Sequence, residues 1–130
     1  MMAHPNEELL RREAKASASG ASLPQELYTE DHVLHYPGRS RLAGEYRGQD
    51  GLADFVARIG ELASSVEREL HDAMANDEHG VQLMTVRAER KDGRRHEWQA
   101  VWVTHFRDGK IAETWGHIQD QDALDEFLDG

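Results

Sequence analysis

The chain has 130 residues, no cysteine, 38% hydrophobic residues and a formal net charge of −10 at pH 7. Disulfides and thiolate chemistry are therefore excluded, and the apolar runs are too short to span a bilayer. The acidic balance argues against nucleic-acid binding, which requires a surplus of basic side chains. The N-terminus has no apolar core of a secretory signal, so we expect one soluble, cytoplasmic domain over residues 1–130, with neither nucleic acid nor membrane as a partner.

Helical patterns dominate the first half of the chain. A first helix is predicted over residues 6–17, with Asn6 as its N-cap and a thin apolar stripe. A helical turn over residues 25–28 leads into a strand over residues 32–36. The best-marked helix spans residues 52–63, where apolar residues recur at helical spacing after Asp50, a good N-cap.

In the second half the hydrophobic period changes to two. Two Asp-Gly turns separate alternating segments, which is a strong hairpin signal. A final short helix over residues 121–128 is predicted to begin after Asp120. Helices followed by a four-stranded antiparallel meander indicate an α+β fold. The four predicted strands are residues 67–75, 81–90, 95–106 and 111–118.

Two segments resemble a known superfamily. The stretch HYPGRSRLAGEYRG, residues 35–48, resembles the strand–loop–helix segment of SnoaL-like proteins, a branch of the nuclear transport factor 2-like superfamily that also contains ketosteroid isomerases. The run HFRDGKIAETWGH, residues 105–117, resembles the last hairpin of the same superfamily, and the resemblance extends from Tyr28 to Phe127. It implies a single SnoaL-like domain that folds as a cone-shaped α+β barrel. In such a fold a strongly curved antiparallel sheet wraps around the N-terminal helices, a short C-terminal helix follows, and the open end holds a small-molecule pocket.

The same resemblance argues against ketosteroid isomerase activity. Those enzymes have an aspartic acid just before a similar His-Phe-Arg run, where this chain has Thr104. Their general-base aspartate corresponds to Tyr36 here. Both halves of the isomerase acid–base pair are therefore absent. We expect Thr104 or Tyr36 to orient a substrate oxygen instead.

Side-chain alternation predicts the pocket walls. On the strand over residues 95–106, the bulkier set that includes Trp98, Trp102 and Thr104 is assigned to the concave side. The opposite set is half apolar, which would suit packing against a second copy, so we expect a homodimer through the sheet. A monomer with a partly apolar outer face is the alternative. Tyr46, in the loop that rims the pocket, is a further candidate substrate contact, and an anchoring role in that loop is the alternative.

Histidine supplies the leading catalytic candidates, because imidazole exchanges protons near neutral pH. His35 on the first strand and His117 on the last form the predicted pair, with Glu113 orienting His117 and Trp115 as a wall. A surface or core role for either histidine stays open. The opposite facing of the last strand also stays open, and it would point Thr114, Gly116 and Ile118 into the pocket.

Asp120 is the third catalytic candidate. SnoaL-like cyclases place an acid–base aspartate four residues after a tryptophan; here Trp115 is followed by Gln119 at that position, and Asp120 is displaced by one. A shift of one residue turns a strand side chain to the opposite face, so helix capping is the favoured role for Asp120.

The sequence contains no metal-ligand spacing and no glycine-rich nucleotide loop, so we expect neither a metal nor a cofactor. His32 is expected at an exposed strand edge, and the basic residues around the 91–93 turn are expected to be solvated. Two functions stay open. One is a cofactor-free acid–base enzyme, such as an isomerase, cyclase, dehydratase or hydrolase, acting on a small apolar organic molecule. The other is a non-catalytic domain that binds a small ligand or dimerises.

Overall fold

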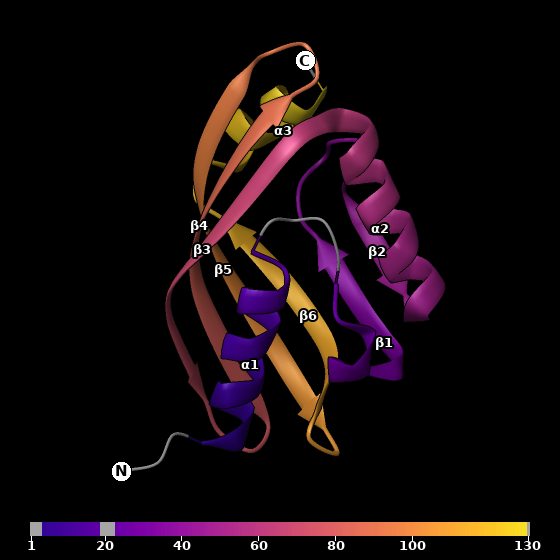
Figure 1. Cartoon of the computed structure of the whole chain (residues 1–130), viewed down its shortest axis with the longest axis vertical. Helices are drawn as coiled ribbons and strands as arrows, with labels where there is room; N and C mark the ends of the chain where they lie inside the picture. Colours follow the sequence, from indigo (N-terminus) through magenta and orange to yellow (C-terminus); the bar gives the residue numbers. More distant parts are fainter. Residues whose placement is uncertain (1–3, 19–22, 130) are drawn as a thin grey trace.

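The computed structural model describes residues 4–18 and 23–129, and within them a strongly curved sheet carries helices on its inner face (Figure 1). The helical elements are α1 (Pro5–Ala16), the 3₁₀ turn η1 (Gln25–Leu27), α2 (Gly48–Leu62) and α3 (Gln121–Asp129). The strands are β1 (Tyr28–Tyr36), β2 (Gly44–Arg47), β3 (Ala63–Ala75), β4 (His79–Arg90), β5 (Arg95–Arg107) and β6 (Lys110–Ile118). The predicted α+β class is confirmed.

The sheet has the strand order β2-β1-β6-β5-β4-β3. All neighbours are antiparallel except β1 and β6, which run parallel. The predicted all-antiparallel sheet is therefore wrong in this pairing. After β2 the chain crosses through α2 to the far edge, and the meander from β3 then brings β6 back beside β1 in the same direction. In the described part of the chain the sheet is open, with β2 and β3 at its edges.

The helix starts differ from the sequence expectations. His4 caps α1 by accepting a hydrogen bond from the Asn6 N–H, so Asn6 lies inside the helix instead of capping it. α2 begins at Gly48 with Arg47 at the N-cap, which leaves Asp50 in its first turn. An acidic side chain there still interacts favourably with the helix dipole. No helix within residues 4–18 and 23–129 is long and apolar enough to cross a membrane.

Two strands also extend the predictions. The edge strand β2 lies where a loop was predicted. Its four residues are too few to show an alternating pattern, so no strand was predicted there. It places Tyr46 in the core, where the hydroxyl donates a hydrogen bond to the Leu42 oxygen at 2.6 Å. β1 begins at Tyr28 and places His32 on the inner face at 1% exposure, which corrects the expectation of an exposed side chain.

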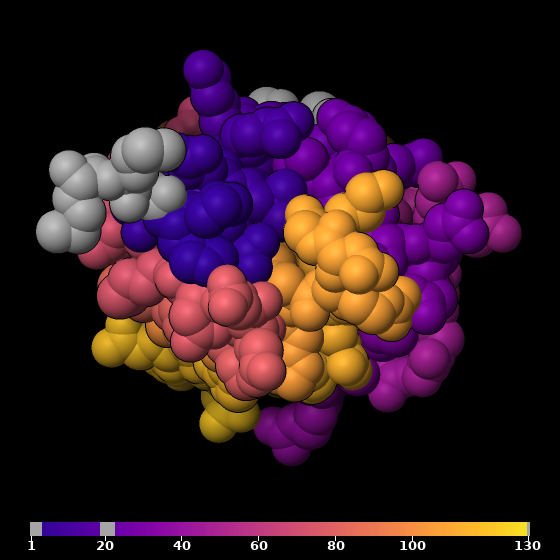
Figure 2. Space-filling model, turned by 90° about the horizontal axis from the view of Figure 1, so that it is seen from below, coloured from indigo at the N-terminus to yellow at the C-terminus, as the bar shows by residue number. Residues whose placement is uncertain are grey.

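α1 packs against β3 and β4 at one end of the molecule. Leu10 packs there with Ile111 and Phe106 in a small apolar cluster. Gly80 lets these side chains pack closely, because a Cβ would lie 2.6 Å from Leu10 Cδ1 and 2.8 Å from Phe106 Cζ and would force them to shift. Figure 2 shows this end, where α1 meets the β3–β4 and β5–β6 turns.

A larger apolar cluster fills the wide part of the molecule between the sheet, α2 and α3. Phe55 of α2 packs against the rings of Tyr36 and Tyr46, with centroids 5.3 and 4.9 Å apart. Burying such a side chain contributes about 1.5–3 kcal/mol. At the other side Phe127 of α3 packs on Trp98.

Candidate functional site

A cavity of about 110 Å³ lies on the inner face of the sheet. Its walls are mainly apolar and aromatic, and come from β1, β4, β5 and α2, with α3 closing one side. Four of the predicted substrate contacts line it: Tyr36, Trp98, Trp102 and Thr104. An enclosed apolar space with a few polar groups is the usual form of a small-molecule site.

The two tyrosines that line the cavity are neutral hydrogen-bonding groups. Burial raises the pKa of Tyr36 well above its usual value. Burial also raises the pKa of Tyr28 well above its usual value; the negative charge of Glu13 adds to this shift and the positive charge of Arg68 opposes it. Both hydroxyls therefore keep their protons at any physiological pH.

A buried polar cluster at one end of the cavity was not found from the sequence. It joins Glu13 and Ser17 at the end of α1 to Arg68 of β3 and Gln82 of β4, and all four line the cavity. Arg68 Nη1 lies 3.4 Å from Glu13 Oε2, and the side chains are 15% and 5% exposed. Arg68 Nη1 also donates to Ser17 Oγ, which in turn contacts Glu13 Oε2 at 3.0 Å. Gln82 Nε2 donates to Glu13 Oε1 at 3.1 Å.

The sequence did contain a signal for this cluster. Arg68 alternates with exposed Glu67 and Glu69 and shares the inner face of β3 with Val66 and Leu70. Glu13 lies on the same buried face of α1 as its leucines. A charged residue at an apolar position of a strand or helix indicates a buried charge that needs a partner. Neither position reveals its partner, because the two residues are 55 positions apart.

His35, Glu113 and Trp115 come together, but on the outer face of the sheet. His35 Nε2 lies 2.6 Å from Glu113 Oε2, and its ring stacks on Trp115 with centroids 5.2 Å apart. None of the three lines the cavity, and neither does His117, which is exposed. The prediction that His35 and His117 face the pocket together with Glu113 and Trp115 is therefore wrong.

A β-bulge in β6 explains the error. Phe106 pairs with Ile111, whereas His105 pairs with Glu113, so Ala112 is an extra residue on β6. Ile111 points inward as the alternation predicts, and the extra residue then inverts the facing of everything that follows. Thr114 therefore lines the cavity, as the alternative facing predicted.

The remaining predicted site residues have structural contacts. Asp120 is exposed, and its Oδ1 accepts a hydrogen bond from the Ala123 N–H at 3.2 Å, which is the capping role that the sequence favoured. Tyr46 does not line the cavity, because it packs on Phe55 behind the wall. Within residues 4–18 and 23–129, no three metal-ligand side chains are placed to hold an ion.

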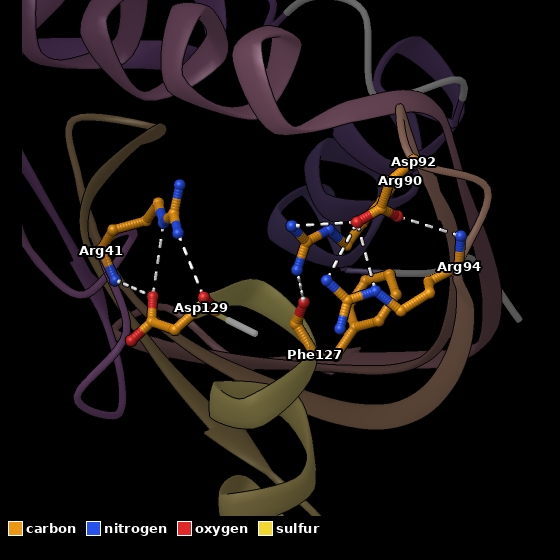
Figure 3. A network of polar contacts seen from close by, with 6 residues as sticks. All are labelled: Arg41, Arg90, Asp92, Arg94, Phe127 and Asp129. Carbon is orange, nitrogen blue, oxygen red and sulfur yellow. Dashed lines mark hydrogen bonds and ion pairs between the residues drawn. The ribbon is translucent and has the colours of Figure 1, made fainter.

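α3 contributes Phe127 and Leu128 to the cavity wall, and its C-terminal end is held by two arginines (Figure 3). Arg90 Nη1 donates to the Phe127 oxygen at 2.7 Å. The Arg41 main-chain N–H donates to Asp129 Oδ1 at 2.8 Å, and its guanidinium donates to the Asp129 oxygen at 3.2 Å. These donors satisfy carbonyls that a helix end leaves unpaired.

A second cleft of about 520 Å³ lies at this end, and Leu62 and Arg90 line both the cleft and the cavity. The Arg90 side chain is only 14% exposed and contacts α3, so it departs from the solvated basic turn that the sequence suggested.

Comparison with known proteins identifies the family. A SnoaL-like domain family matches residues 17–114. The chain belongs to the SnoaL-like domain family. No curated protein matches the sequence.

Solved structures of this fold cover nearly the whole chain. Bal32a, from a soil-derived mobile gene cassette, is 30% identical with a TM-score of 0.86, over 95% of this chain and 96% of Bal32a. TerC, co-crystallised with polyporic acid, is 18% identical with a TM-score of 0.82, over 96% of this chain and 98% of TerC. A putative SnoaL-like polyketide cyclase from Jannaschia sp. CCS1 is 14% identical with a TM-score of 0.77, over 95% of this chain and 91% of the cyclase. The last two similarities show the fold alone.

Proposed function

We propose that this protein binds a small, mainly apolar organic molecule inside the curved sheet. The cavity itself carries the proposal, because aromatic and aliphatic walls enclose it and polar groups gather at one end. Such a site gains binding free energy from burying apolar ligand surface and gains orientation from a few hydrogen bonds. The co-crystal of TerC with polyporic acid supports a small-molecule role for the fold.

A direct test measures ethylbenzene binding by NMR titration. Ala88 is buried and lines the cavity, so Ala88→Leu places three extra carbon atoms in the space that the ligand would occupy. We expect saturable binding to the wild type and at least a tenfold weaker affinity in this variant. Ala57→Leu is the matched control, because Ala57 is exposed on α2 and does not line the cavity. Equal binding by both variants would contradict the proposal.

Proton transfer on the bound molecule is the second candidate function. It is favoured by the carboxylate of Glu13, which lines the cavity close to the neutral hydroxyl of Tyr28. A carboxylate at this place would remove a proton next to a ligand carbonyl and return it, with a neutral donor stabilising the enolate. The histidine pair predicted from the sequence is not used in this scheme.

The proton-transfer candidate is tested by exchange of the methyl protons of acetophenone in D₂O, followed by NMR. We expect the wild type to accelerate exchange and Glu13→Gln to lose most of this acceleration. Glu67→Gln, at an exposed position of β3, is the control. Exchange at the uncatalysed rate in the wild type would leave binding as the function.

Three further expectations from the sequence stay predictions: a homodimer, a cytoplasmic location and a single domain. The outer face of β5 presents Val101 and Val103, both half-buried. Light scattering after size-exclusion chromatography tests the dimer, and Val103→Glu should shift the particle to the monomer mass.

Cell fractionation tests the cytoplasmic location. A single cooperative unfolding transition is the outcome expected for one domain.

A further inference from the structure

The guanidinium of Arg68 has a donor that is poorly used. Its Nη2 atom lies 3.3 Å from Met84 Sδ, the one acceptor of Nη2 among the described residues. A thioether is a weak acceptor, whereas a guanidinium carries five N–H donors. Because the side chain lines the cavity and is only 15% exposed, a ligand oxygen is the partner that would satisfy this donor best.

The guanidinium is held in place by its neighbours. Glu13 contacts Nη1, and Gln82 and Ser17 fix the Glu13 carboxylate from either side. The Arg68 main-chain N–H also donates to the Ala18 oxygen at 2.7 Å, which ties β3 to the end of α1. A donor held this firmly needs little reorganisation when a ligand binds.

The charges of the cluster distinguish between ligand classes. Arg68 and Glu13 together carry one positive and one negative charge. A ligand carboxylate would add a second, uncompensated negative charge to this buried site, which is unfavourable. A neutral carbonyl oxygen accepts from the guanidinium without adding charge, and Arg68 would stabilise any negative charge that develops on it.

We propose that Arg68 Nη2 anchors the carbonyl oxygen of a neutral, ketone-like ligand whose apolar body lies against the aromatic walls of the cavity. This inference rests on the proposed binding function and adds the chemical class of the ligand. Glu13, the charge partner of Arg68, lies outside residues 17–114. The match to the SnoaL-like domain family therefore does not include every residue of this site.

The experiment compares three probes of similar shape by NMR titration: acetophenone, ethylbenzene and benzoate. The wild type is expected to bind acetophenone about tenfold more tightly than ethylbenzene, as for a hydrogen bond to a charged donor, and more tightly than benzoate. Arg68→Met should remove the preference, so that the variant binds acetophenone and ethylbenzene with similar affinity. Arg87→Met is the matched control, because Arg87 is exposed on the adjacent strand and pairs with Glu97.

A second variant guards against misfolding. Arg68→Met alone leaves the Glu13 carboxylate buried without its partner, so Glu13→Gln/Arg68→Met removes both charges together and should also lose the preference. The role of Arg68 as the anchor is overturned, and the proposed function is not, if either variant retains the preference for acetophenone. It is likewise overturned if the wild type binds benzoate more tightly than acetophenone. Equal binding of ethylbenzene and acetophenone by the wild type also overturns it. Failure of all three probes to bind the wild type overturns both the anchor and the proposed function.

Discussion

His35 Nε2 lies 2.6 Å from Glu113 Oε2 on the outer face of the sheet, on the opposite side from the cavity. Both side chains are partly exposed, at 25% and 35%, so the pair contributes at most about 1 kcal/mol to stability.

The first prediction follows from this placement. His35→Ala and His117→Ala should each leave the dissociation constant of a cavity ligand within about twofold of the wild type. Trp102→Leu, which changes a cavity wall, should weaken binding markedly. Calorimetric titration measures all three, and a tenfold loss in either histidine variant would restore the histidines as site residues.

The second prediction concerns the contact between Gly116 and Trp102. A Cβ on Gly116 would lie 2.8 Å from the Trp102 ring and 3.0 Å from Pro37 Cδ, so Gly116→Ala must shift the ring or the strand. Overpacking of this kind destabilises by about 1–3 kcal/mol. Gly60→Ala is the control: its Cβ meets no atom within 4 Å in α2, so that variant should gain about 0.5–1 kcal/mol. Urea unfolding measures both, and equal effects would contradict the close contact.

The third prediction concerns the attachment of α3. Arg90→Met removes the donor to the Phe127 oxygen and should destabilise the protein by about 1–3 kcal/mol. Faster amide hydrogen exchange is expected in α3 before other helices. Arg94→Met removes only an exposed ion pair with Asp92, so it should change stability by less than about 1 kcal/mol. Unchanged exchange in α3 of the Arg90 variant would show that other contacts hold the helix.

The fourth prediction is a pH dependence that originates at His32. Burial lowers the pKa of this histidine below its usual value of 6.5, and a hydrogen bond with the Gly48 backbone and the charge of Asp31 oppose the shift. The Tyr28 ring also faces it, with its centroid 4.9 Å away.

The sign follows from proton linkage. Below pH 6.5 the unfolded chain binds a proton at His32 that the folded chain does not, so the free energy of unfolding falls as the pH drops from 6.5 to the lower folded pKa. At higher pH the residue is neutral in both states and has no effect. His32→Phe should reduce the loss of stability between neutral and mildly acidic pH, measured by urea unfolding. An identical loss in both proteins would assign the pH dependence to other groups.

Local pattern determined much of the fold from the sequence alone. The change from helical to two-residue periodicity and the two Asp-Gly turns located β3 to β6 and the last helix, because period and turn chemistry depend on neighbouring residues. The alternation on β5 correctly placed Trp98, Trp102 and Thr104 on the cavity side, since this strand keeps its alternation over those positions.

The tertiary structure decided what depends on distant residues. The bulge at Ala112 arises from the pairing of β5 with β6, and it turned Glu113, Trp115 and His117 away from the cavity. The parallel pairing of β1 with β6 required the whole chain between them. Glu13 and Arg68 become a buried pair only when α1 packs on β3, because a buried charge is stable only beside a partner that folding brings to it.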